Sequence, residues 1–178
     1  QLLAAVTIRG GTSPTVTAPS GWTLVRSDAI STTVAQYVYR HRAGPSEPAS
    51  WTWGFSKRES AAGTVSAFAN VDPTNPVNAA SGSANATSSS SITTSATSAS
   101  RCGSLLVGLY GIARATSISP STGMTEGAEA ASSNGKHLAS SEVSIRGMAA
   151  TGTTGNPPAT AGAPFVSIGQ LVVLNPAG

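Results

Sequence analysis

Charged residues, aromatic residues and cysteine are all scarce in this chain of 178 residues. Charged side chains make up 10% of it, against about 25% in ordinary soluble domains. The single cysteine, Cys102, excludes an intrachain disulfide framework and a cysteine-rich zinc site. No apolar run approaches the roughly 18 residues that a transmembrane helix needs, so membrane insertion through a helix is excluded.

The basic residues are too few and too scattered to form a nucleic-acid surface. The chain has 10 Lys and Arg residues and a formal net charge of +3, whereas such a surface needs clustered positive charge. Apolar residues nevertheless make up 39% of the chain. That proportion supplies enough apolar surface for a folded core.

Alternating β-forming residues, separated by Gly, Pro, Asn and Ser, dominate the sequence. The best helical segment, residues 125–133, has no apolar stripe. Strands are predicted at residues 2–8, 33–40, 51–55, 63–68, 105–110, 138–146 and 166–174. Short strands with frequent turn residues are typical of an all-β sandwich of the jelly-roll or immunoglobulin-like type.

Three short matches between the two halves of the chain occur in the same order. Residues 2–7 resemble 105–110, residues 17–23 resemble 118–125, and residues 63–68 resemble 169–174. They predict one domain, residues 1–178, built from two homologous halves at about 1–80 and 101–178. Two separate small domains are the alternative, but each would bury too little apolar surface. The matching Trp22 and Met124 are expected to close the end of the sandwich.

The segment between the halves, residues 81–100, consists largely of Ser and Thr. Its composition is that of a flexible linker or a glycosylated stalk. Thr and Ile are β-formers, however, and residues 91–96 have the composition of a polar edge strand. We favour the ordered strand over a disordered linker.

No residue pattern points to a catalytic, cofactor-binding or metal-binding site. Asp72 is expected to cap the turn before Pro73, and His41 is flanked by Arg40 and Arg42, which repel a cation. No Gly-x-Ser-x-Gly elbow precedes a helix. Loop carbonyls with Asp28 or Asp72 leave a calcium site open. Most of the seven acidic residues lie beside turns and are expected to be solvated: Asp28, Glu47, Glu59, Asp72, Glu126, Glu129 and Glu142.

The aromatic residues allow two interpretations. Trp51, Trp53 and Phe55 alternate on one face of a predicted strand, and Tyr37 and Tyr39 lie on a nearby one. We expect them to be largely buried in the core, since each ring buries about 150–250 Å². The alternative is a sugar-stacking platform formed by Trp51, Trp53, Tyr37 and Tyr39, which would leave the rings open to solvent.

Three segments resemble a β-sandwich module of bacteriophage virion proteins (decoration or tail) and of bacterial exported surface proteins. They are residues 16–25 (VTAPSGWTLV), 47–53 (EPASWTW) and 67–73 (AFANVDP). The resemblance covers nearly the whole chain, but its motifs are turns and core residues, so it transfers no catalytic residue. Members have Gly-Asp before the first Leu-Leu strand. Because Gln1 stands there in this chain, we expect a trimmed start.

The resemblance implies a non-enzymatic structural protein, located in a virion or on an extracellular surface. Its expected partners are copies of itself or other structural proteins of that assembly, with no nucleic acid, no cofactor and no membrane insertion. The alternative is a carbohydrate-binding or adhesive module that uses the Trp51 and Trp53 face. An enzyme whose site the sequence hides is a third hypothesis.

Overall fold

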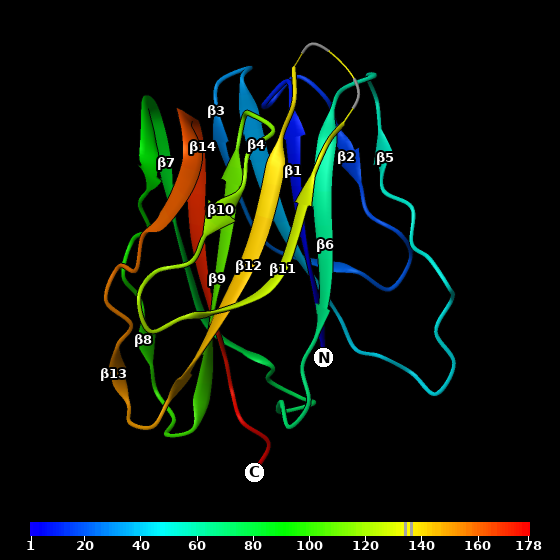
Figure 1. The fold of residues 1–178 in the computed structure, drawn as a ribbon. Coiled ribbons are helices and arrows are strands. Elements are labelled where there is room, and N and C mark those ends of the chain that lie inside the picture. Colours follow the sequence, from blue (N-terminus) through cyan, green and yellow to red (C-terminus); the bar gives the residue numbers. More distant parts are fainter. Residues whose placement is uncertain (134, 136) are drawn as a thin grey trace.

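Two antiparallel sheets stacked face to face build the computed structural model, which describes residues 1–133, 135 and 137–178 (Figure 1). The first sheet has the order β3 (Thr23–Ile30), β4 (Val34–His41), β1 (Leu2–Arg9) and β6 (Ala61–Ala67). The second has the order β7 (Val77–Ile92), β14 (Ala159–Leu174), β9 (Ser104–Ile112), β12 (Ser140–Met148) and β11 (Thr125–Ala131), and β10 (Ile118–Ser119) pairs with the start of β14.

Two short strand pairs complete the structure. They are β2 (Val16–Thr17) with β5 (Gly54–Phe55), and β8 (Ser98–Ala99) with β13 (Gly152–Thr153). The described residues contain no helix, so none of them forms a helix that could span a membrane. The all-β prediction and the sandwich architecture are confirmed.

Several strands differ from the prediction. Only Gly54–Phe55 of the predicted strand at 51–55 is in a ladder. β3 and β11 were not predicted, and β11 occupies the segment with the best helical pattern. Both are edge strands on their sheets. Their weak β patterns (TLVRSDAI and TEGAEAA) are overridden by the ladders they form with β4 and β12.

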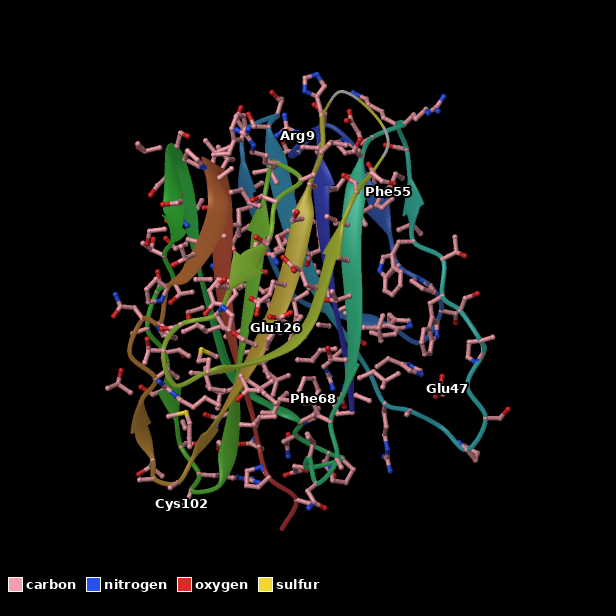
Figure 2. The ribbon with its side chains drawn as sticks, in the orientation of Figure 1. Arg9, Glu47, Phe55, Phe68, Cys102 and Glu126 are labelled. Atoms are coloured by element: carbon pink, nitrogen blue, oxygen red, sulfur yellow. The ribbon has the colours of Figure 1, made fainter. Side chains whose placement is uncertain are left out.

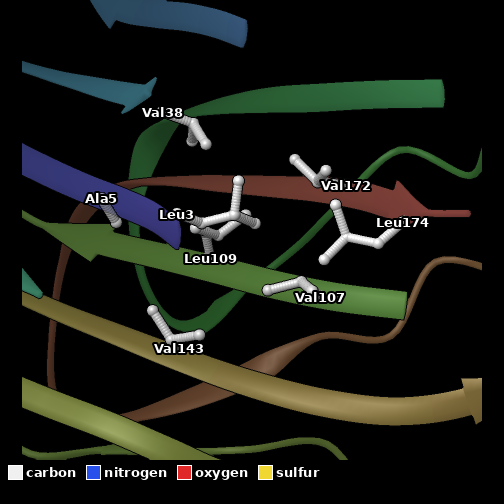
Figure 3. Close-up of a cluster of buried hydrophobic side chains, with 8 residues drawn as sticks. All are labelled: Leu3, Ala5, Val38, Val107, Leu109, Val143, Val172 and Leu174. Carbon is white, nitrogen blue, oxygen red and sulfur yellow. The ribbon is translucent and has the colours of Figure 1, made fainter. Parts of the chain in front are cut away.

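The main core lies between the two sheets (Figure 3). Alternation along each strand sends every second side chain inward, and the inner faces of both sheets contribute small and medium aliphatic residues. The buried members of this cluster are Leu3, Ala5, Val38, Val107, Leu109, Val143, Val172 and Leu174. Aliphatic residues of this size fill the space between the sheets, and the large aromatic rings lie elsewhere.

The two sheets repeat the same pairing pattern. In the first sheet Val38 of β4 pairs with Ala5 of β1, and in the second Val143 of β12 pairs with Leu109 of β9. All four side chains lie in the core between the sheets. The ladders therefore make Leu3 the counterpart of Val107. The sequence match of 2–7 with 105–110 instead made Leu106 its counterpart, which is one residue away. A one-residue slip exchanges the faces of a strand, so that match was wrong in register.

The turn before the third strand of each half also recurs. Gly21 has φ 82° and Gly123 has φ 81°, a left-handed conformation that glycine adopts without strain. The residue after each glycine donates its backbone N–H three residues back, Trp22 to Pro19 at 3.3 Å and Met124 to Ser121 at 2.9 Å. The homology of the halves itself stays a prediction.

Most of the Ser/Thr-rich segment is ordered as the 16-residue strand β7, at the edge of the second sheet (Figure 1). The favoured prediction of an edge strand is therefore confirmed in kind but wrong in position, since the strand ends at Ile92. Residues 93–96 then fold back over β7, where Asn85 donates to the carbonyl of Thr93 at 3.1 Å and Ser81 donates to Ser95. Small side chains let these two layers approach closely.

Candidate functional site

A second apolar cluster covers the outer face of the first sheet. Trp22 follows the glycine turn and packs against Leu2, Ala4 and Tyr39, with 8% of its surface exposed. Met124 holds the matching place on the second sheet, where it packs with Leu106. The expectation that these residues close the end of the sandwich was wrong, because each covers the outer face of its own sheet.

The four residues of the predicted sugar platform do come together around Trp22. Its ring lies 5.4 Å from Trp51 and 5.2 Å from Trp53, at interplanar angles of 84° and 63°. Tyr39 lies 6.2 Å from Trp53 and stacks on Tyr37 at 6.3 Å. Edge-to-face arrangements of this kind are favourable aromatic contacts. The rings thus form one packed aromatic cluster.

This packing differs from both interpretations of the aromatic residues. Trp51, Trp53 and Phe55 are more buried than exposed, in line with the expectation, but they lie outside the core between the sheets, so their expected place in that core was wrong. Tyr39 is 5% exposed and cannot offer a face to a ligand. The Nε1 atom of Trp53 is buried without a hydrogen-bond partner. A flat platform of four open rings is therefore not formed.

His41, at the end of β4, joins this cluster to the loop that follows it. Its ring stacks on Trp22 at 5.3 Å with an interplanar angle of 29°. Nδ1 lies 2.9 Å from the carbonyl oxygen of Gly21, and Nε2 lies 3.2 Å from the carboxylate of Glu47. Both partners accept hydrogen bonds, so each contact is a hydrogen bond when the ring nitrogen that faces it carries a proton.

Glu47 holds the loop in place through two contacts of its carboxylate. Its carboxylate accepts the backbone N–H of Gly44 as well as the contact from His41. These contacts, the backbone hydrogen bond first, lower the pKa of Glu47. Figure 2 shows Glu47 on the loop that projects from the sandwich at the right of the view. The loop is thereby held open beside the aromatic cluster.

Between this loop and the sheet lies a hollow of about 550 Å³. Trp51 forms part of its wall, with His41, Glu47 and the exposed Arg42. Within the described residues the guanidinium of Arg42 has no hydrogen bond or ion pair. The remaining lining residues are small or polar: Pro19, Ser20, Gly44, Ser46, Pro48, Ser50 and Thr52.

Glu142 is the residue whose environment differs most from its sequence context. It was expected to be solvated, but it is 0% exposed and neither carboxylate oxygen has a hydrogen-bond partner. On the outer face of β12 it is flanked in the ladders by Tyr110 and Glu129. Burial, with the nearby charges of Glu126 and Glu129, raises its pKa to about 8. The only signal in the sequence was its place in the middle of the predicted strand at residues 138–146.

Two of the other acidic residues, Asp72 and Asp28, have structural partners. Asp72 accepts the backbone N–H groups of Thr74 and Asn75 at 2.9 and 3.0 Å, which confirms the predicted cap. Asp28 pairs with Arg26 at 2.6 Å and accepts from Gln170 at 2.7 Å. Across residues 1–133, 135 and 137–178, no group of three His, Cys, Asp or Glu side chains is placed to hold a metal ion.

The remaining nucleophilic and basic side chains are dispersed. Cys102 is exposed at the lower end of the molecule in Figure 2. His137 lines a different hollow, of about 670 Å³, with Arg58 and Glu59. The structure therefore does not bring Cys102 and the two histidines to one place.

Comparison with known proteins leaves these sites as the main guide to function. No family model, no curated protein and no solved structure matches this chain.

Proposed function

We propose that this chain is a non-enzymatic structural protein of a virion or of another extracellular surface assembly, joined to its neighbours through the edge strand β7. The observation that carries the proposal is the chemistry of that edge. β7 runs for 16 residues without a charged side chain, which corresponds to about 50 Å of strand. In the described part of the chain it pairs only with β14.

An unpaired strand edge presents a row of free N–H and C=O groups to another chain. Soluble proteins usually protect such an edge with charged residues, prolines or a covering element. The other edge strands carry this protection: β3 has Arg26 and Asp28, and β11 has Glu126 and Glu129. β6 lies beside β11, and part of β7 lies beside β3, whose Arg26 and Asp28 side chains approach Gly82. Residues 93–96 fold over another part of β7. The positions of β7 that remain exposed, Ala84 and Ala86 among them, carry no charge, which favours a partner at that part of the edge.

The partner expected at this edge is a second copy of the chain or a structural neighbour with a similar strand. Antiparallel pairing of two β7 edges would be self-complementary, since neither strand carries a charge that would face itself. The small Ser and Ala side chains allow the neighbour to approach closely. We expect each stable contact to bury more than about 1,000 Å² in total.

The test is the assembly state of lysine variants. Ala84→Lys with Ala86→Lys places two charges on exposed positions of β7. Thr122→Lys with Thr151→Lys adds the same charge at exposed turn positions outside the strands. The wild type and the turn variant (Thr122→Lys with Thr151→Lys) are expected to sediment as oligomers or to attach to native particles. The β7 variant (Ala84→Lys with Ala86→Lys) is expected to sediment as a folded monomer. A wild type that sediments as a monomer and attaches to no particle or cell surface would overturn the proposal.

A further inference from the structure

We propose that the hollow beside the aromatic cluster is a binding site for an acidic saccharide, with Trp51 contacting the sugar ring and Arg42 pairing with its carboxylate. The proposal concerns the first sheet and the loop at residues 42–53. It is independent of the β7 interface, because β7 belongs to the other sheet.

Trp51 is the ring that the cluster leaves in part available. It is partly buried, its ring meets those of Trp22 and His41 at interplanar angles of 84° and 61°, and it forms part of the wall of the hollow. An aromatic ring combined with a few fixed polar groups is the usual composition of a small-molecule site. Trp53 contacts both Trp22 and Tyr39, so these residues contribute by holding Trp22, the ring that contacts the indole of Trp51.

The polar side of the hollow is positioned before any ligand arrives. Glu47 is held by His41 and by the backbone of Gly44. Because the loop is already ordered, it loses little conformational entropy when a ligand binds. Ser20, Ser46, Ser50 and Thr52 supply hydroxyl and backbone groups along the same wall. Groups of this kind match the hydroxyls of a sugar.

The charge of the hollow indicates which class of sugar fits. Glu47 is paired with His41, which leaves Arg42 as the charge at this hollow without a partner among the described residues. A guanidinium binds a carboxylate through two parallel hydrogen bonds. The site therefore favours a uronic acid over a neutral hexose.

The test is a titration followed by tryptophan fluorescence and calorimetry, with a short oligogalacturonide and a neutral malto-oligosaccharide of equal length as probes. The wild type is expected to bind the oligogalacturonide at least about tenfold more tightly than the neutral sugar. Free galacturonic acid is titrated in parallel. Binding of either acidic probe supports the proposal. The ratio of their two dissociation constants tells whether the site needs an oligosaccharide or a single sugar ring.

Three variants separate the site from unspecific attraction. Arg42→Gln is expected to weaken binding of the acidic sugar about tenfold or more, and Trp51→Phe to weaken it less than Trp51→Ala. Arg114→Gln removes the same charge from an exposed residue at another hollow and is expected to bind as the wild type does. Because Arg42 is exposed, its variant is expected to fold even where Trp51→Ala does not.

The proposal is wrong if neither acidic probe binds, if the neutral sugar binds equally well, or if the two arginine variants lose the same affinity. Assembly through β7 is measured separately by sedimentation. A failure of sugar binding would therefore leave the proposed structural function standing.

Discussion

Replacing Glu142 by Gln is expected to remove a large pH dependence from the stability of this protein. The carboxyl group is 0% exposed, has no hydrogen-bond partner for either oxygen, and has a pKa raised to about 8. Glutamine has nearly the same size and shape but cannot ionise. The substitution therefore tests the charge of the buried group while leaving the packing on β12 almost unchanged.

The sign of the effect follows from the direction of the shift. The folded protein keeps the proton on Glu142 over a range of pH in which the unfolded chain, with a pKa of 4.5, has lost it. The stabilisation is thus complete below about pH 4.5 and is lost as the pH rises to about 8. At 1.36 kcal/mol per pH unit, linkage predicts that unfolding becomes easier by roughly 3–4 kcal/mol between pH 5 and pH 8.

The assay is urea-induced unfolding of the wild type and of Glu142→Gln at a series of pH values between those limits. The free energy of unfolding of the wild type is expected to fall with pH relative to that of the variant, which becomes the more stable protein at pH 8. Glu126→Gln removes a neighbouring charge that raises the pKa of Glu142, so the loss of stability in that variant is expected to level off at a lower pH and to be smaller. Parallel curves for the wild type and Glu142→Gln would refute the reasoning.

Two further predictions concern the two apolar layers, and both are checked by denaturant unfolding. Leu109→Ala empties part of the core between the sheets, where Leu109 is 0% exposed, and is expected to cost about 2–5 kcal/mol; Leu24→Ala, at a residue 48% exposed, is the control and is expected to change stability by less than about 0.5 kcal/mol. Trp22→Ala removes the centre of the outer aromatic cluster and is expected to cost about 3–5 kcal/mol, and a loss below 1 kcal/mol would show that this layer is not part of the folded core.

Local patterns in the sequence were sufficient for the central strands. β1 and β9 are nearly continuous runs of apolar and small residues that are buried on both faces, and a short apolar run bounded by turn residues is typical of a fully buried strand. The cap at Asp72 was also predictable, since an Asp before Pro and Asn forms its hydrogen bonds within three residues. Such features depend on neighbours along the chain.

The register of the strands, and which segments pair with or cover one another, depend on residues far apart in the sequence. The tertiary structure therefore decided them. The one-residue difference between the sequence match and the ladders became visible only when Leu3 and Val107 were found in the same layer. Likewise, β11 has the composition of a loop or weak helix and is a strand because β12 lies beside it. Hydrogen bonds to a neighbouring strand stabilise an extended conformation that the residues of the segment favour only weakly by themselves.

The same distinction between local and long-range features applies to the candidate sites. The sequence itself indicated that aromatic residues would gather near Tyr37 and Trp53, because they are few and fall on two predicted strands that follow each other along the chain. Only the tertiary structure decided that Trp22 would cover them, that His41 would meet Glu47, and that Glu142 would be closed off from water. Burial is produced by whichever segments fold over a side chain, and those segments are distant in sequence, so no local pattern records it.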